Sequence, residues 1–144
     1  MNGSNYCRVE FAAKSSNEGF ARSTAACFAA QLDPTLEELQ DIKTAVSEAV
    51  TNCVVHAYTD QIGEITLKMR IIGDIFEISV RDKGCGIADI KQAMEPMFTT
   101  GGEERSGMGF SIMECFMDKV TVRSRQGRGT SVTMRKQIRG KQSK

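Results

Sequence analysis

The sequence predicts an α+β fold, a two-layer sandwich in which helices cover one face of a mostly antiparallel sheet. Two neighbouring runs with alternating apolar residues predict paired strands, a long segment with apolar faces predicts a helix, and strands and helices do not alternate strictly along the chain. The chain has 144 residues, of which 40% are hydrophobic, and this suffices for one core. We therefore expect a single domain over residues 1–138 and a basic tail over residues 139–144.

The N-terminal part is predicted to hold a strand and a helix. Apolar and polar residues alternate over residues 7–11, which indicates a short strand. Ser15 or Ser16 can cap the following helix, which should reach about Leu32. The predicted inner face of this helix consists of Phe20, Thr24, Cys27, Phe28 and Leu32.

A long second helix should follow the break at Asp33-Pro34. Thr35 and Glu38 have the spacing of a capping box, in which each residue's side chain accepts a hydrogen bond from the other's backbone N–H. We expect this helix to end near Tyr58.

The second half should contain a hairpin, two helices, a mobile loop and two further strands. Alternating apolar residues predict the hairpin strands, and clusters of glycine mark the turns and the loop. The expected elements, in order, are strands over residues 65–71 and 76–80 joined by Gly73-Asp74, a glycine-rich turn over 82–86, a short helix to about 95, a loop over 99–109, a helix over 108–117, and strands over 120–124 and 130–134.

Composition excludes several function classes. The net charge is +1, so no general electrostatic attraction to nucleic acid or to an anionic membrane is expected. The basic end, Arg135 to Lys144, has no interleaved aromatic residue and is interpreted as solvated. No apolar run is long enough to span a bilayer, and the N-terminus lacks the apolar core of a signal peptide.

The cysteines point to the cytoplasm. Five of them are scattered without a C-x-x-C pair, and their number is odd. This usage argues against a disulfide framework or a structural zinc site and favours a reducing compartment. They are Cys7, Cys27, Cys53, Cys85 and Cys115.

The second helix carries the most informative feature of the chain. Glu48, Asn52 and His56 are spaced i, i+4, i+8, so on a helix they form one polar stripe among apolar neighbours. Buried polar groups need partners, and a bound metal with its nucleotide would supply them. A polar seam against a neighbouring strand explains the stripe equally well, and it is the favoured interpretation of the stripe alone.

Three later segments are rich in glycine. Asp82-x-Gly84-x-Gly86 follows a strand, where a carboxylate can accept a hydrogen bond from an exocyclic amine such as that of adenine. Residues 106–110 begin a helix, where free N–H groups can bind phosphate. Gly129-Thr130 begins a strand, where a hydroxyl could reach a base or a water. Singly, these are weak signals that also fit an ordinary turn, a hinge and a strand residue.

The order of these motifs is more specific than any one of them. The sequence has no Walker A motif, no strand-linked G-x-G-x-x-G and no eukaryotic-type kinase signature. The order of helix stripe, D-x-G-x-G, loop, G-x-G and Gly-Thr resembles the ATP-binding domain shared by gyrase B, a heat-shock chaperone, histidine kinases and MutL. This resemblance covers nearly the whole chain.

A narrower resemblance is to the bacterial sporulation anti-sigma-F factors. Members of this family are small serine-protein kinases that bind a sporulation sigma factor and phosphorylate a serine of an anti-anti-sigma factor. The resemblance also implies a homodimer. It rests on residues 47–52, 96–100, 104–110, 112–114, 116–118 and 31–35.

The resemblance implies roles for individual residues and implies ATP and Mg²⁺ as cofactors. Asn52 corresponds to the Mg²⁺ ligand, and Glu48 is placed to accept the proton of the attacking serine. Arg105 could offset charge on the transferring phosphoryl group, and Asp82 would bind the adenine amine. The remaining expected nucleotide-binding residues are Gly84, Gly86, Ile87, Thr99, Thr100, Ser106, Gly107, Met108, Gly109, Phe110 and Thr130.

Three alternative functions share features with this sequence. A sensor histidine kinase is disfavoured because the only histidine, His56, lies inside the first motif. A non-catalytic nucleotide-binding module is disfavoured because the base is present at Glu48. A stress-response anti-sigma kinase shares the fold and the chemistry, and only the local matches favour the sporulation type. The loop departs from that type at Gly101-Gly102, where a lysine and a proline are expected.

Partner surfaces are predicted only in outline. Arg22 lies opposite the apolar face of the first helix, and it is a candidate recognition charge, although an exposed arginine is usually only solvated. Our hypothesis is that the first strand and first helix supply the dimer contact. The loop and Arg22 would then face the sigma factor and the anti-anti-sigma factor.

Overall fold

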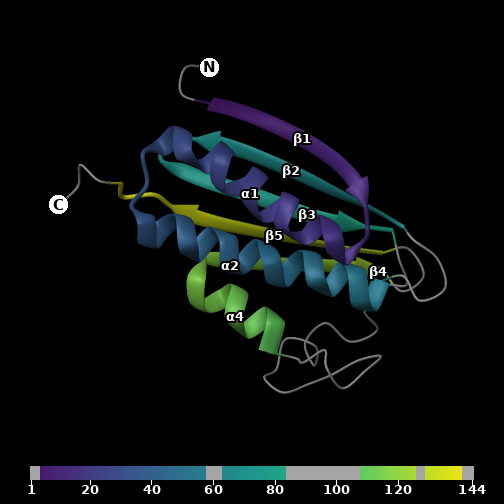
Figure 1. The fold of residues 1–144 in the computed structure, drawn as a ribbon. Helices are drawn as coiled ribbons and strands as arrows, with labels where there is room; N and C mark the ends of the chain where they lie inside the picture. The colour runs from purple at the N-terminus through teal and green to yellow at the C-terminus, as the bar shows by residue number, and fades with distance from the viewer. Residues whose placement is uncertain (1–3, 58–62, 84–107, 126–128, 141–144) are drawn as a thin grey trace.

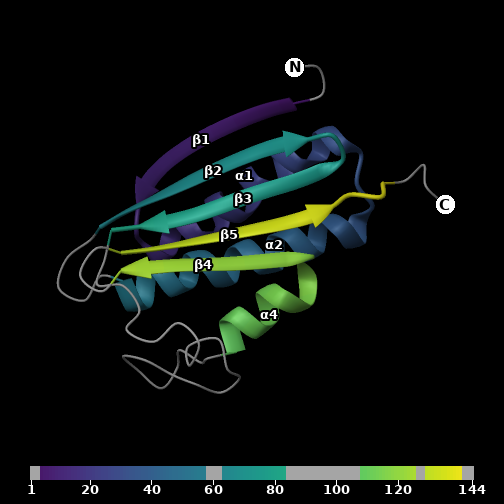
Figure 2. The ribbon, with the colours of Figure 1, turned by 180° about the vertical axis from the view of Figure 1, so that it is seen from behind.

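The structure is a computed structural model that describes residues 4–57, 63–83, 108–125 and 129–140. Five strands form one antiparallel sheet in the order β1-β2-β3-β5-β4. The helices α1, α2 and α4 lie on one face of it (Figure 1). Figure 2 shows the opposite face, over which no helix of the described residues lies. The predicted α+β sandwich is confirmed.

The strands follow the predicted alternation. In the hairpin the buried residues of the β2 and β3 inner faces are apolar apart from Asp82 at the end of β3, and Gly73 turns the chain at a φ of 62°. β1 forms one edge of the sheet and β4 the other. The bounds are Ser4–Ala12 for β1, Glu64–Ile72 for β2, Ile75–Asp82 for β3, Lys119–Arg125 for β4 and Gly129–Gln137 for β5.

The first helical segment spans the predicted residues, and its inner face agrees with the prediction only in part. It comprises a 3₁₀ turn (Ser15–Asn17), α1 (Glu18–Ala29) and a second 3₁₀ turn (Ala30–Leu32). Phe20 is 50% exposed and Cys27 is exposed. Phe28 and Leu32 are partly buried and pack against the core, as predicted. The buried positions of α1 are alanines, because methyl side chains let a helix backbone pack closely. These are Ala21, Ala25, Ala26 and Ala29.

α2 (Leu36–Asn52) begins at the predicted capping box. The Glu38 N–H donates to Thr35 Oγ1 at 3.0 Å, and the Thr35 N–H donates to Glu38 Oε1 at 2.9 Å. The helix buries an apolar face against the sheet and against α1 and α4. Its buried residues are Ile42, Ala45, Val46, Ala49 and Val50.

The helical coil continues past Asn52 as a π-helical turn over Cys53–Ala57, close to the predicted end. A π turn holds more residues than an α turn, so its last residues leave the α-helical register. The expectation of one stripe along an α-helix therefore applies to Glu48 and Asn52, while His56 lies in the π turn.

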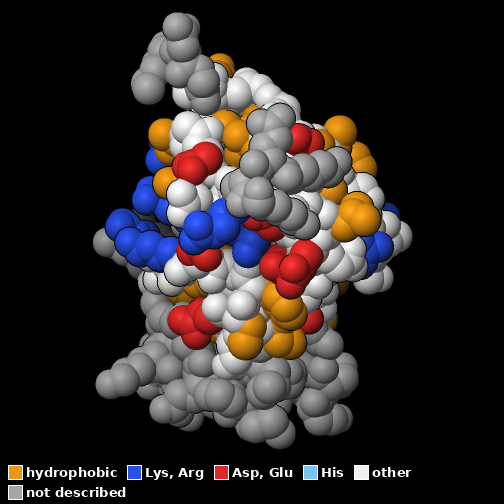
Figure 3. All heavy atoms as spheres, turned by 90° about the vertical axis from the view of Figure 1, so that its left-hand side faces the viewer, with side chains coloured by type: hydrophobic (Ala, Val, Ile, Leu, Met, Phe, Trp, Pro, Cys, Tyr) orange, Lys and Arg blue, Asp and Glu red, His pale blue; other side chains and the backbone are white. Residues whose placement is uncertain are grey.

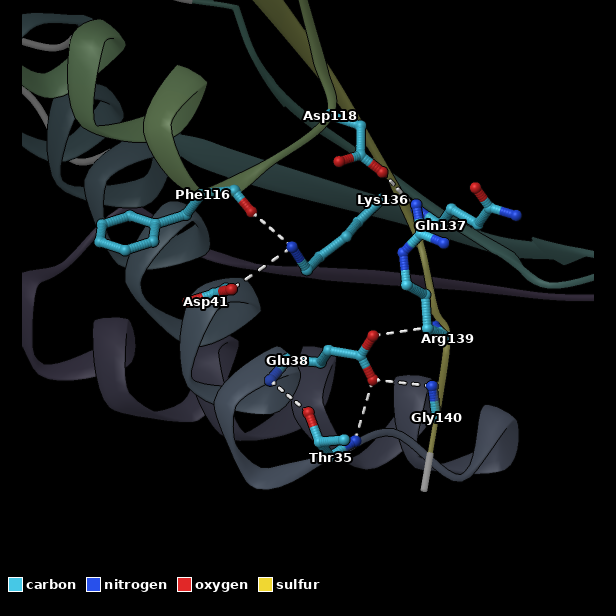
Figure 4. A network of polar contacts seen from close by, with 9 residues as sticks. All are labelled: Thr35, Glu38, Asp41, Phe116, Asp118, Lys136, Gln137, Arg139 and Gly140. Carbon is cyan, nitrogen blue, oxygen red and sulfur yellow. Dashed lines mark hydrogen bonds and ion pairs between the residues drawn. The ribbon is translucent and has the colours of Figure 1, made fainter. Parts of the chain in front are cut away.

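The C-terminal strand is tied to α2, contrary to the expectation that the chain is solvated from Arg135 onward. Lys136 Nζ lies 3.3 Å from Asp41 Oδ2 and donates to the Phe116 carbonyl at 2.9 Å (Figure 4). The Arg139 and Gly140 N–H groups donate to the carboxylate of Glu38 at 2.8 and 3.1 Å. Figure 3 shows acidic and basic side chains close together at this end of the molecule.

Glu38 thus joins a helix start to the end of the chain. Partial burial raises the pKa of its carboxyl, but the backbone donors of Thr35, Arg139 and Gly140, together with the charge of Lys136, outweigh burial, so the pKa is lowered. The ionised carboxylate is therefore the form that this contact stabilises.

Candidate functional site

The candidate site begins at the end of β3. The side chain of Asp82 is 5% exposed there. Its Oδ1 accepts the Thr130 backbone N–H at 3.2 Å, and its Oδ2 accepts the Cys53 thiol at 3.3 Å. A buried carboxylate requires such donors, and these two hold it from different segments of the chain.

Gly129 brings the start of β5 against the end of β3. Its φ is 111°, a region that residues with a side chain rarely adopt. A Cβ placed on it would collide with the carbonyl oxygen of Asp82 and lie 2.7 Å from Lys83 Cα. Next to it, Thr130 Oγ1 and Ser124 Oγ share a hydrogen bond of 2.9 Å. Gly129 is therefore what allows the Thr130 N–H to reach Asp82.

The polar side chains of α2 meet the start of α4 (Met108–Phe116). A Cβ placed on Gly109 would lie 3.1 Å from Asn52 Nδ2 and 3.4 Å from Glu48 Oε1. The approach to Asn52 is tight and the approach to Glu48 is an ordinary contact, so a side chain at residue 109 would require Asn52 to shift by a few tenths of an ångström. Glu48 and Asn52 are both partly exposed.

α4 is fixed by apolar anchors. The side chains of Phe110, Met113 and Met117 lie in the core. This leaves the backbone of Phe110, rather than its ring, as the part that can contact a ligand. The first residues of α4 carry N–H groups without helical acceptors, which suit an anion.

Cys53 connects the two halves of the site. It directly follows Asn52, which faces α4, and its own thiol faces Asp82. Burial, followed by the charge of Asp82 and the hydrogen bond to it, raises the pKa of Cys53 well above its usual value. The thiol therefore stays protonated.

Several predicted positions fall outside the described residues. The short helix to about residue 95 and most of the predicted loop are among them, and only the backbone of His56 and Met108 is described. The predicted site residues outside the description are Gly84, Gly86, Ile87, Thr99, Thr100, Arg105, Ser106 and Gly107.

Two contacts of the site were not anticipated from the sequence. Cys53 was expected to be a small core residue, and Ser124 was not singled out. The sequence carries a signal for Cys53, namely its place next to Asn52, but no spacing rule relates it to Asp82, which is 29 residues away.

The residues present fit a purine nucleotide with a divalent cation. At one end of the site the Asp82 carboxylate can accept a hydrogen bond from an amine N–H. At the other end the Asn52 side chain offers a carboxamide oxygen, which is a ligand type that Mg²⁺ accepts. The clearance at Gly109 is the structural observation that supports the fit, because it keeps both α2 side chains beside a helix N-terminus. None of the helices in the described ranges has the length and apolar character needed to cross a membrane.

Comparison of sequences places the chain in a known family. Residues 11–136 match the family described as the histidine kinase-like ATPase domain. An anti-sigma F factor of Thermoanaerobacter sp. (strain X514) is 55% identical over 96% of this chain and 97% of its own. An anti-sigma F factor of Geobacillus kaustophilus is 52% identical over 93% of both chains.

Solved structures agree on the fold. The crystal structure of the RsbU and RsbW domains of a Mycobacterium tuberculosis protein superposes with a TM-score of 0.69 at 18% identity, covering 93% of this chain and 32% of that one. The mycobacterial sensor histidine kinase MprB superposes with a TM-score of 0.59 at 14% identity, over 94% and 99%. On its sequence and its fold, the chain belongs to the anti-sigma F factor family, within the histidine kinase-like ATPase domain family.

Proposed function

We propose that the protein binds and inhibits a sporulation sigma factor and, with Mg²⁺ and ATP, phosphorylates a serine of an anti-anti-sigma factor. Family membership supports the anti-sigma role. The observation that carries the kinase proposal is the placement of Glu48 and Asn52 together against Gly109 at the start of α4. The Glu48 carboxylate and the Asn52 carboxamide, which is a possible metal ligand, thus lie beside the N-terminus of α4, and a helix N-terminus suits phosphate.

Each side chain has a separate role in this proposal. ATP and Mg²⁺, when bound, supply the phosphoryl group and neutralise its charge. Glu48 accepts the proton of the serine hydroxyl, one helical turn before Asn52, whose oxygen binds the metal. The Asp82 carboxylate accepts a hydrogen bond from the exocyclic amine of adenine. Arg105 offsets negative charge on the transferred phosphoryl group. Phosphoryl transfer depends mainly on positioning and electrostatics, so few groups suffice.

Transfer of label from ATP to a purified anti-anti-sigma protein tests the kinase proposal. Wild-type protein should label a serine of the partner. Glu48→Ala should abolish transfer while Mg-ATP still binds, whereas Asn52→Ala should lose Mg-ATP binding itself. Full transfer by Glu48→Ala would contradict the general-base role. Lys43→Ala, on the same helix, is the matched control and should label normally.

We further propose that Arg22 contacts the protein partners. Its guanidinium lies 3.0 Å from Glu18 Oε2 and 3.5 Å from Ser47 Oγ, and its side chain remains 44% exposed. The charge is therefore held in place but accessible. Arg22→Glu should lose both partners in a pull-down with ATP binding intact, while Arg123→Glu, an exposed arginine on β4 at the opposite edge of the sheet, should retain them. Unchanged binding by Arg22→Glu would refute the proposal.

A homodimer formed through β1 and α1 is also part of the proposal. β1 is an edge strand, and Tyr6 and Phe20 are 81% and 50% exposed on these two elements. Phe20→Glu should convert a dimer to a monomer in light scattering. Leu36→Glu alters another exposed apolar residue, at the start of α2, and should leave the dimer intact. A dimeric Phe20→Glu protein would contradict this contact.

A cytoplasmic location stays a prediction from the scattered cysteines. Of the five, the structure describes Cys7, Cys27, Cys53 and Cys115, all as free thiols.

A further inference from the structure

Cys53 makes a contact with Asp82 that an ordinary core cysteine does not make. Its Sγ lies 3.3 Å from Asp82 Oδ2, and both residues are 5% exposed. An ionised carboxylate has acceptors only, so the thiol is the donor in this hydrogen bond. The contact is therefore a donation from the π turn that follows α2 to the end of β3.

The Asp82 carboxylate is thereby held at both oxygens. Thr130 donates to Oδ1 and Cys53 donates to Oδ2. The terminal torsion of an aspartate is soft, so a single donor would leave the plane of the carboxylate poorly defined. Two donors from different segments fix that plane. A carboxylate oxygen has two lone pairs, so one hydrogen bond at an oxygen does not exhaust what that oxygen can accept.

We infer that Cys53 is a positioning residue for base selection: its thiol orients the Asp82 carboxylate toward the exocyclic amine of a 6-aminopurine nucleotide. The inference rests on the proposed function, because it requires Asp82 to bind the base. It gives the site a preference for adenine over guanine, whose carbonyl oxygen at the same ring position would face the carboxylate without a hydrogen to share.

Calorimetric binding of two nucleotides tests the inference. The first is Mg-ATP and the second is the Mg complex of purine riboside triphosphate, which lacks the exocyclic amine. Cys53→Ala should weaken ATP binding about five-fold, the order expected for one hydrogen bond, and change binding of the analogue less than about two-fold. Cys53→Ser restores a donor and should recover most of the ATP affinity. Cys27→Ala, on the exposed side of α1, should change neither.

The outcomes that would overturn the inference are distinct from failure of the proposed function. An equal loss for both nucleotides in Cys53→Ala would show a packing effect alone and refute the positioning role. Cys53→Val fills the space without a donor and must show the same selective loss, which covers the case in which the alanine variant does not fold. Asp82→Asn is the reference: if it keeps the preference for ATP over the analogue, adenine recognition by Asp82 and the role of Cys53 both fail. If it loses the preference and Cys53→Ala and Cys53→Val keep it, only the role of Cys53 fails.

Discussion

Two buried carboxylates of β3 are held in different ways. Glu77, 7% exposed, is paired with the guanidinium groups of Arg70 on β2 and Arg135 on β5, its cross-strand neighbours. Asp82, 5% exposed at the end of the same strand, accepts from the Cys53 thiol and from the Thr130 N–H. One carboxylate is held by two cations, and the other has neutral groups among its donors.

The difference separates a structural carboxylate from a candidate ligand contact. Two guanidinium groups compensate the charge of Glu77, so its burial is explained within the sheet. A thiol and a backbone N–H are neutral, so what these two donors contribute to Asp82 is its orientation. A buried and oriented acceptor at the end of a strand is therefore a better candidate for ligand binding than a buried ion pair on the open face of the sheet.

The largest effect is expected from the glycine that supports Asp82. Gly129→Ala combines a positive φ with a collision against the β3 backbone and should cost about 3 kcal/mol of unfolding free energy, with loss of ATP binding. Gly73→Ala also has a positive φ but meets open space in the β2–β3 turn, so about 1 kcal/mol is expected. Chemical denaturation of both variants measures the difference. Equal losses of unfolding free energy in the two variants would show that the close contact of Gly129 with the end of β3 adds nothing to stability.

Glu77 should affect stability without affecting ligand binding. Glu77→Gln removes the charge between two half-exposed arginines and should cost about 1–2 kcal/mol, a value reduced by solvent screening of the exposed partners. Its affinity for Mg-ATP should stay within about two-fold of wild type, because the side chain lies on the face opposite Asp82. Loss of ATP binding in the folded variant would contradict the claim that Glu77 has a structural role only.

Gly109 tests the other half of the site. Gly109→Ala should weaken Mg-ATP binding several-fold, because the added methyl group presses on Asn52, while stability changes by less than about 1 kcal/mol. Gly19→Ala in α1 gains the same helix propensity and meets only Arg22 Nη2 at an ordinary 3.6 Å. It should bind Mg-ATP normally. Normal binding by Gly109→Ala would show that this clearance is unnecessary.

The smallest effect concerns pH. Burial raises the pKa of Glu77, but the hydrogen bonds and charges of Arg70 and Arg135 outweigh burial, so the pKa lies below its usual 4.5. A lowered folded-state pKa gives stability that is present above about pH 4.5 and is lost as the pH falls through the folded-state value. Urea unfolding from pH 7 to pH 3 should show this loss, and Glu77→Gln should reduce its slope. An unchanged slope would contradict the assignment.

Local patterns in the sequence predicted much of the fold. The capping box of Thr35 and Glu38, the hairpin turn at Gly73 and the alternation in the strands depend on near neighbours, and all three are present. The alanine face of α1 was missed, because apolar size suggested Phe20 and Cys27 while close packing selects small residues.

The contacts that orient the site could not be predicted in the same way. The Cys53–Asp82 and Thr130–Asp82 hydrogen bonds join residues 29 and 48 positions apart, so they exist only once the sheet and α2 have packed. The π turn at Cys53 likewise has no sequence signature that distinguishes it from continued α-helix. The chain could indicate Asp82 and Asn52 as candidates, whereas their supporting groups required the structure.

Phosphoamino-acid analysis of the anti-anti-sigma partner after incubation with labelled Mg-ATP is the most direct test of the account. Wild-type and Glu77→Gln proteins should both produce phosphoserine on the partner, since Glu77 serves the sheet. Asp82→Asn should produce little or none at an ATP concentration near the wild-type Kd, since it lacks the base contact. Phosphate on a histidine of the chain itself, or equal transfer by Asp82→Asn and wild type, would contradict the account.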